Sequence, residues 1–313
     1  MKNSLHVIVG TGPLGIAVME ELLADGKRCV MINRSGEGEV GVDVQLIAAD
    51  ATDHESILEA CEGAEVIYNC TNAPYTKWPD MLPPIVDGIM YAAQETGARL
   101  VHADNLYMYG MTYQRLTEDL PYESTEPKGK TRATIATKLM DKHHKGHIQV
   151  AIGRGSNVFG PRVIDSTVGR GVFEAALKDQ PAQVLGDATL LHTYTYIKDF
   201  AKGLVMLGER DSALGHVWHI PSAPTISTKE FITKVYRQLG KEPQYRVAPT
   251  LGIQFLSLFN ASMRETKRIL YMFEQPLIVD HTKYDKAFGA EPTNHELAIQ
   301  ETIAWYKEYL TKK

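Results

Sequence analysis

Cysteine, long apolar runs and charge of one sign are all scarce in this sequence of 313 residues. Its three cysteines, Cys29, Cys61 and Cys70, lie scattered in apolar segments. An odd and scattered set does not form a disulfide framework, so we expect reduced thiols in the core. No window approaches about 18 consecutive apolar residues, and the first apolar stretch is too short for a signal peptide. We therefore expect a soluble, cytoplasmic protein that does not use a membrane.

The charged residues are mixed in sign. Lysine and arginine number 33 against 38 aspartates and glutamates, and no long run of either sign occurs. This pattern excludes the basic surface with which a protein binds nucleic acid. The histidines of segment 141–147 are interrupted by Gly146 and lack an acid or cysteine at ligand spacing on a second segment, so we expect no metal site. The partner class that remains is a small-molecule substrate.

Apolar runs of strand length alternate with amphipathic stretches of helix length through the first half of the chain. This alternation is typical of right-handed βαβ units on a parallel sheet. The predicted buried strands are 5–9, 28–32, 44–49, 65–70, 99–103 and 147–153. We therefore predict an α/β fold, with a Rossmann-type doubly wound parallel sheet and a smaller C-terminal α/β substrate lobe.

The alternation weakens after about residue 160, where prolines begin to punctuate the chain. We place a dinucleotide-binding domain at 1–163, to which 190–220 returns, and a substrate-binding lobe at 164–189 and 221–313. The apolar stretch 251–263 is expected to be a helix packed over the substrate pocket, and the alternative is a membrane-surface or partner helix.

A glycine-rich stretch follows the first predicted strand. Gly10, Gly12 and Gly15 have the G-x-G-x-x-G spacing at the mouth of a helix, where missing side chains let the backbone approach a pyrophosphate. The match lies inside a βαβ unit of suitable length, so it predicts dinucleotide binding. The predicted pyrophosphate loop comprises Gly10, Thr11, Gly12, Pro13, Leu14 and Gly15.

The end of the second predicted strand bears on the choice of cofactor. An NAD-preferring site offers an acid there to the adenosine ribose, but this chain has Asn33 and Arg34. An uncharged side chain does not repel a 2′-phosphate, and a guanidinium can bind one. NADP is therefore favoured over NAD, and the alternative is that Arg34 is a solvated loop residue. Asp50, followed by Ala51, could accept a hydrogen bond from adenine or serve as a helix cap.

Six motifs in order carry a resemblance to a known family. They are GTGPLG (10–15), DATD (50–53), NCTNA (69–73), RGSNVFGPR (154–162), HTYTYIKDFAKGL (192–204) and the C-terminal stretch 288–310. The chain resembles the extended short-chain dehydrogenase/reductases, the family of NAD-dependent epimerases and dehydratases, over nearly its whole length. The resemblance implies that Thr71 flanks the cofactor. It also suggests a homodimer through the helices after strands four and five.

The resemblance implies where an active site lies. Segment 101–110 matches the family's fifth-strand segment, with Asn105 where members have serine or threonine. Leu106 and Tyr107 stand where dehydratases have a pair of acids, so elimination of water by that route is not expected. The tyrosine of the family's Tyr-x-x-x-Lys pair corresponds to Thr134, and its lysine to Lys138.

Lys138 is expected to hold the nicotinamide ribose, as the family's lysine does, and the alternative is a surface lysine on an exposed helix face. A threonine hydroxyl titrates far above the value of about 10 for a phenol. The proton donor would then be Tyr107 or Lys138 itself. Asn105 would orient the substrate oxygen, and Tyr75 and Trp78 would form a wall of the substrate pocket.

Two further residues bear on the substrate. Asn157 matches the family's asparagine near the substrate phosphates. His192 takes the place of an arginine that resembles a clamp for the diphosphate of nucleotide sugars, and histidine is a poor bidentate replacement. We therefore expect a smaller or less charged substrate, a carbonyl compound or an activated alkene.

The leading hypothesis is an NADP-dependent oxidoreductase of atypical short-chain type, acting on such a small substrate. One alternative is a non-catalytic NADP-binding protein that serves as redox sensor or scaffold. The other is a nucleotide-sugar epimerase with a displaced acid/base.

Overall fold

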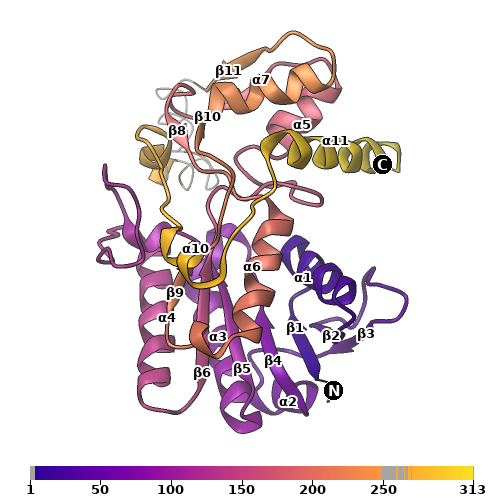
Figure 1. Cartoon of the computed structure of the whole chain (residues 1–313), viewed down its shortest axis with the longest axis vertical. Coiled ribbons are helices and arrows are strands. Elements are labelled where there is room, and N and C mark those ends of the chain that lie inside the picture. The colour runs from indigo at the N-terminus through magenta and orange to yellow at the C-terminus, as the bar shows by residue number, and fades with distance from the viewer. Residues whose placement is uncertain (1–3, 249–258, 260–263, 265–266, 269, 313) are drawn as a thin grey trace.

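The computed structural model describes residues 4–248, 259, 264, 267–268 and 270–312. Figure 1 shows a parallel sheet with helices on both sides in one part of the molecule, and a smaller group of helices and short strands beyond one end of it. Of the apolar stretch 251–263, for which a helix is predicted, only Phe259 is among the described residues.

The sheet has seven strands in the order β3-β2-β1-β4-β5-β6-β9, and every pair is parallel. The strands are β1 (Leu5–Val9), β2 (Arg28–Asn33), β3 (Gln45–Ala48), β4 (Ala64–Asn69), β5 (Arg99–Asp104), β6 (Gln149–Arg154) and β9 (Val217–His219). The first six confirm the predicted strands, and the sheet confirms the predicted fold class. β9 was not predicted because three residues far along the chain give no periodicity to detect.

The chain reverses its direction of winding at β1, which has β2 on one side and β4 on the other. In open parallel sheets a ligand crevice lies at such a switch point, beyond the carboxyl ends of the strands. The loop after β1 and the loop after β4 therefore meet at the expected place for a binding site.

Helices cover both faces of the sheet (Figure 1). α1 (Pro13–Ala24) and α6 (Ile197–Glu209) pack together on one face, with Ile8 and Met31 beneath them. On the other face lie α2 (His54–Ala60), α3 (Trp78–Thr96) and α4 (Pro127–His144). Because neighbouring strand residues point to opposite faces, each strand feeds both cores. The strands that end at this switch point are thus supported by two separate apolar layers, one on each face of the sheet.

The smaller group of elements in Figure 1 contains two short strand pairs, β7 (Ala182–Val184) with β11 (Tyr245–Val247) and β8 (Leu191–His192) with β10 (Ile226–Ser227). Its helices are α5 (Arg170–Leu177), α7 (Thr228–Gln238) and α11 (His295–Thr311). The chain passes from β8 back to the main sheet through α6 and β9, and α10 (Thr282–Phe288) packs beside β9.

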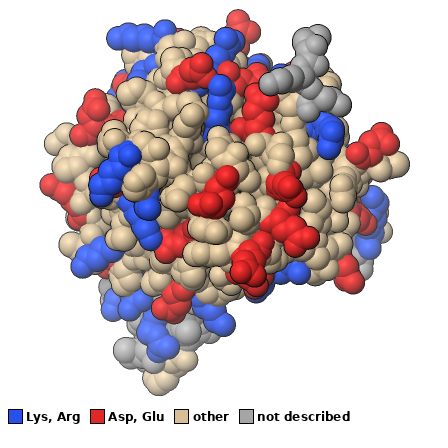
Figure 2. Space-filling view, turned by 90° about the horizontal axis from the view of Figure 1, so that it is seen from below, with Lys and Arg blue, Asp and Glu red and all other residues tan. Residues whose placement is uncertain are grey.

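The cysteines, the surface charges and the apolar helices of the described residues can be compared with what the composition predicts. Cys29, Cys61 and Cys70 are free and buried, and burial raises the pKa of the Cys61 and Cys70 thiols to about 12, so they are core thiols of low reactivity. Basic and acidic side chains both occur across the face seen in Figure 2. No helix in the described part of the chain is long and apolar enough to cross a membrane.

Candidate functional site

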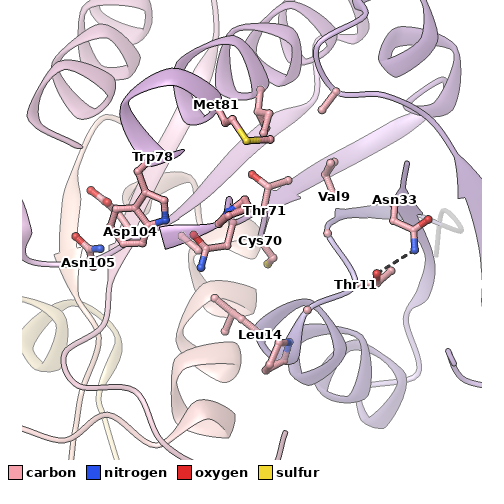
Figure 3. Close-up of a pocket in the computed structure, with 18 of the residues that line it drawn as sticks. Val9, Thr11, Leu14, Asn33, Cys70, Thr71, Trp78, Met81, Asp104 and Asn105 are labelled. Carbon is pink, nitrogen blue, oxygen red and sulfur yellow. Dashed lines mark hydrogen bonds between the residues drawn. The ribbon is translucent and has the colours of Figure 1, made fainter. Parts of the chain in front are cut away.

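A cavity of about 880 Å³ lies beyond the carboxyl ends of β1, β2, β4 and β5. In Figure 3, Asn33 and Thr11 lie at one end of it, Trp78, Asp104 and Asn105 at the other, and Thr71 and Cys70 between them. An elongated cavity with polar groups at both ends suits a long, two-ended ligand.

The three glycines of the first loop have three separate physical roles. Gly10 has a φ of 110°, and a Cβ on it would lie 2.8 Å from the carbonyl oxygen of Cys70. A Cβ on Gly15 would lie 1.9 Å from the carbonyl oxygen of Gly10, so α1 can pack this closely on β1 only with glycine there. A Cβ on Gly12 would meet nothing within 4 Å and would enter open space beside the cavity.

The start of α1 has the features of an anion-binding site. Gly12 is the N-cap residue and supplies no side-chain hydrogen bond to the first turn, and Pro13 follows it. The backbone NH groups of a helix start and the helix dipole both favour a negative group. Gly12, the loop residue whose open side faces the cavity, therefore leaves room for a diphosphate at this position. Thr11, Pro13 and Leu14 also line the cavity, as predicted.

The adenosine end is formed by the predicted residues Asn33, Arg34, Asp50 and Ala51, which all line the cavity. The Asn33 amide donates to the Thr11 hydroxyl at 3.0 Å, and its oxygen accepts the Gly36 NH at 2.7 Å, so this uncharged side chain is fixed in place. Arg34 is exposed at the cavity rim. The Asp50 carboxylate accepts from the NH and hydroxyl of Thr52, which lowers its pKa.

The opposite end of the cavity is built from β5 and α4. Asn105 lines the wall, and its side-chain oxygen accepts the backbone NH of Tyr107 at 3.1 Å. Arg132 also lines the wall, with its guanidinium carbon 4.5 Å from the centroid of the Trp78 ring. Trp78 and Thr71, both predicted, line the cavity here, and the Thr71 hydroxyl donates to Asn69.

Arg132 belongs to a buried charge cluster. Its Nη1 lies 3.4 Å from Oδ1 of Asp104, and Nε of Arg154 lies 3.4 Å from the other oxygen of the same carboxylate. Two guanidiniums share one carboxylate, so the cluster carries excess positive charge next to the cavity. Nε of Arg132 is buried and has no hydrogen-bond partner among the described residues. A buried donor without a partner is costly, and the Arg132 residue that carries it lines the cavity.

The prediction for Lys138 is wrong in its position. α4 begins at Pro127, so Lys138 lies six residues beyond Arg132, about 240° around the helix from the cavity-facing side. Its ammonium binds the Asp87 carboxylate of α3 at 2.7 Å, and its side chain is 47% exposed. Thr134 is exposed as well, and its hydroxyl donates to the Lys130 carbonyl. The surface-lysine alternative is therefore the correct one.

The residues four apart on the buried face of α4 are Lys128 and Arg132. Both are buried, at 5% and 6% exposed. The Lys128 ammonium lies 4.0 Å from the centroid of the Tyr75 ring, as Arg132 lies over Trp78. The buried face of α4 therefore presents a Lys-x-x-x-Arg pair, and Thr134 and Lys138 lie outside it.

The prediction of Tyr107 as a proton donor also needs correction. Its hydroxyl lies 3.2 Å from that of Tyr75, and its ring packs 5.5 Å from Trp78, inside an aromatic cluster. Burial raises the pKa of both tyrosines, so neither phenol releases a proton readily. Neither is among the described residues that line the cavity, and Tyr75 supports Lys128 instead of forming the substrate wall.

The two residues predicted for the substrate lie against each other. The Asn157 amide nitrogen is 3.3 Å from Nδ1 of His192 and 3.2 Å from the carbonyl oxygen of Thr193. His192 is 2% exposed, and burial lowers its pKa to about 4. It is therefore uncharged near neutral pH. Among the described residues neither one lines the large cavity, and His192 borders a separate small one of about 20 Å³.

Lys128 and Arg132 were not predicted, because the family's Tyr-x-x-x-Lys pair was matched to Thr134 and Lys138, six residues further along α4. The signal that could have found them is Pro127, since proline is favoured at the first position of a helix. The sequence reasoning also missed the part of α3 that lines the cavity, Met81, Pro84 and Ile85. In the described residues no group of three or more histidines, cysteines or acids is arranged to hold a metal ion.

Comparison with known proteins gives one family. The model of the NAD dependent epimerase/dehydratase family matches residues 7–220. UDP-glucuronic acid decarboxylase 4 from Arabidopsis thaliana is 27% identical over 279 residues, covering 81% of this chain and 60% of that protein. Across the three such Arabidopsis decarboxylases that match, this chain spans 53–60% of their length.

Solved structures share the fold. UDP-glucuronic acid 4-epimerase from Bacillus cereus, in complex with NAD, has a TM-score of 0.79 at 19% identity, covering 99% of this chain and 98% of that one. dTDP-glucose 4,6-dehydratase from Bacillus anthracis, also in complex with NAD, has a TM-score of 0.79 at 15% identity, with 97% of each chain covered.

Proposed function

This chain belongs to the NAD dependent epimerase/dehydratase family, and we propose that it binds a nicotinamide dinucleotide and uses it for hydride transfer at a carbinol or carbonyl carbon of a nucleotide-linked sugar. The observation that carries the proposal is one continuous cavity. It reaches from the glycine loop and Asn33 at one end to Asn105 and Arg132 at the other.

Each part of the chain has a task in this proposal. The first turn of α1 holds the diphosphate, and Asp50 and Arg34 bind the adenosine half. Arg132 donates to the nicotinamide ribose, in place of the family's lysine. Asn105 orients the substrate oxygen at the wall. The bound dinucleotide supplies the acceptor or donor of the hydride.

The residues at the adenosine end favour NADP over NAD. Asn33 is uncharged and fixed by its bonds to Thr11 and Gly36, so no acid occupies the end of β2. Arg34 stands at the rim, where a guanidinium would bind a 2′-phosphate. We expect Arg34→Ala to weaken NADPH binding by about tenfold and to leave NADH binding within about twofold, because one charge-assisted contact is worth about 1.4 kcal/mol or more.

The relatives favour a nucleotide sugar over the small carbonyl compound or alkene expected from the sequence. UDP-glucuronic acid decarboxylases and a UDP-glucuronic acid 4-epimerase are among them. Positive charge for a diphosphate would come from Arg268, whose Nε lies 4.0 Å from the Glu126 carboxylate just before α4.

A second candidate is reduction of a small carbonyl compound. The observation that favours it is the neutral, buried His192 in place of the arginine clamp, because an uncharged imidazole adds no attraction for a diphosphate. A third, binding of the dinucleotide without catalysis, is favoured by the absence of the family's tyrosine and lysine from the cavity-facing side of α4.

The test begins with fluorescence titration of the purified chain with NADPH and NADH. Lys138→Ala is the matched control, since this lysine lies on the surface. The protein is then incubated with UDP-glucose or UDP-glucuronic acid and each cofactor, and separately with NADPH and a panel of aldehydes and ketones. Conversion of a UDP-sugar supports the main proposal, and conversion of a small carbonyl compound alone supports the second. Binding without any conversion supports the third, and lack of saturable binding contradicts all three.

A further inference from the structure

Lys128 occupies a fixed place at the start of α4. It follows Pro127, the first residue of the helix, and only 5% of it is exposed. The next residue, Gly129, packs so closely that a Cβ there would lie 2.4 Å from the carbonyl oxygen of Tyr107. The first turn of α4 therefore cannot shift without moving the loop that follows β5.

Aromatic rings hold Lys128 and Arg132 side by side. The Lys128 ammonium lies 4.0 Å from the Tyr75 ring centroid, and Arg132 lies 4.5 Å from that of Trp78. The two rings meet edge to face at 5.2 Å. Lys128 is not itself among the described residues that line the cavity. Residues four apart are neighbours on one helix face, so it lies about one turn from the wall formed by Arg132.

Lys128 also faces the C-terminal part of the chain. Glu126, two residues before it, is 4.0 Å from Arg268. Arg268, in the C-terminal part of the chain, therefore lies near the start of α4 that carries Lys128. A substrate held by the C-terminal part would meet the cofactor in this region.

The surroundings of Lys128 suit proton transfer. Burial and, to a smaller extent, the charge of Arg268 lower the pKa of Lys128 while Glu126 raises it, and the net result is a pKa of about 8. An amine that titrates near ambient pH exists in both protonation states, and a group of this kind transfers protons efficiently. Neither Tyr75 nor Tyr107 titrates near ambient pH, because burial raises the pKa of both phenols.

We propose that Lys128 is the general acid and base of this chain's hydride-transfer reaction, a role that the family gives to a tyrosine. The inference rests on the proposed function. In the oxidative direction the neutral amine accepts the proton of the substrate hydroxyl, and the hydrogen on the same carbon leaves with its bonding electrons to the nicotinamide. The products are a carbonyl group, an ammonium and the reduced cofactor. In reduction the ammonium returns its proton to the carbonyl oxygen as hydride arrives.

The first test compares Lys128→Met, Lys128→Arg and Lys128→Tyr in the full chain. The methionine variant keeps the length of the side chain without its proton, and the arginine variant keeps the charge but does not release a proton near neutral pH. Both are expected to bind NADPH within about threefold of the wild type and to lose turnover of the UDP-sugar or carbonyl compound by about 10²–10⁴-fold. The tyrosine variant is expected to recover part of the turnover. Circular dichroism melting confirms that each variant folds.

The second test does not depend on turnover. Lysines of the full chain are reductively methylated with ¹³C-formaldehyde, and the NMR signal missing from Lys128→Met is followed through a pH titration with NADPH present. We expect its midpoint to lie well below that of the exposed Lys138. A midpoint near the ordinary value of about 10.4, or unchanged turnover in Lys128→Met, overturns the inference. Lack of NADPH binding by the wild type instead contradicts the proposed function, so the two failures are distinguishable.

Discussion

The ammonium of Lys138 lies 2.7 Å from the carboxylate of Asp87, and this pair links α4 to α3 on the outside of the molecule. Both side chains are partly exposed, at 47% and 39%. The lysine that the sequence motif predicts for the site thus forms a surface ion pair, and Arg132 lines the cavity instead.

Lys138→Ala should consequently leave cofactor binding within about twofold and lower the free energy of unfolding by no more than about 1 kcal/mol, because exposed ion pairs contribute little. NADPH fluorescence titration and urea unfolding measure the two effects. A tenfold loss of affinity would return Lys138 to the binding site.

Arg132→Ala should weaken NADPH binding by tenfold or more, since it removes the buried donor at the end of the cavity. Arg132→Lys should restore part of the affinity, because the charge remains while the fork of donors is lost. Isothermal titration calorimetry of the two variants beside Lys138→Ala checks this. Equal affinities in all three would mean that Arg132 does not touch the cofactor.

Gly12→Ala is expected to weaken cofactor binding, whereas Gly15→Ala is expected to destabilise the fold. The methyl group added at Gly12 enters open space, so the free energy of unfolding should change by less than about 1 kcal/mol. The NADPH affinity should fall at least tenfold, because the methyl group takes the place of the diphosphate. The Gly15 methyl would lie 1.9 Å from a backbone oxygen, so this variant should lose about 2–3 kcal/mol of stability or more. Urea unfolding and NADPH titration separate the two. A Gly12→Ala protein that binds like the wild type would place the diphosphate elsewhere.

Stability should fall as the pH drops from 7 to 5. Burial lowers the pKa of His102 and His192 to about 4 and that of His219 to about 3, against about 6.5 in the unfolded chain. These folded-state pKa values are depressed, so the unfolded chain binds the extra protons. The stabilisation is fully present above about pH 6.5 and is lost as the pH falls toward 4.

Each of these histidines contributes a slope of roughly 1.4 kcal/mol per pH unit within that window. Urea unfolding at a series of pH values measures the sum over the buried histidines, and His192→Gln should reduce the slope by roughly 1.4 kcal/mol per pH unit. A free energy of unfolding that is constant between pH 7 and 5 would show that these imidazoles reach water.

Much of the fold could be predicted from the sequence, because strand and helix periodicity and the glycine spacing are local. Gly10, Gly12 and Gly15 follow a buried strand in the printed sequence, and each has the geometry that its position in the motif requires. The end of the cavity predicted to bind adenosine could be placed as well. Asn33 ends β2, Arg34 follows it and Asp50 lies two residues after β3, and all three line the cavity.

The other end of the cavity could not be placed in this way. Which residues of α4 face the cavity depends on how the helix packs against its neighbours. The predicted pair, Thr134 and Lys138, lies six residues beyond Lys128 and Arg132, about 240° around the helix. Asn157 and His192, 35 residues apart, contact each other because residues 193–197 run alongside residues 156–159, where Phe159 and Tyr196 form a parallel bridge.

The sequence by itself determined a dinucleotide-type α/β sheet with a glycine loop at its switch point, because those signals depend on neighbours within a few residues. Only the tertiary structure decided that the buried face of α4 carries Lys128 and Arg132, held over the rings of Tyr75 and Trp78. Burial and packing between α3 and α4 select those two side chains, and such contacts leave no periodic pattern in the sequence.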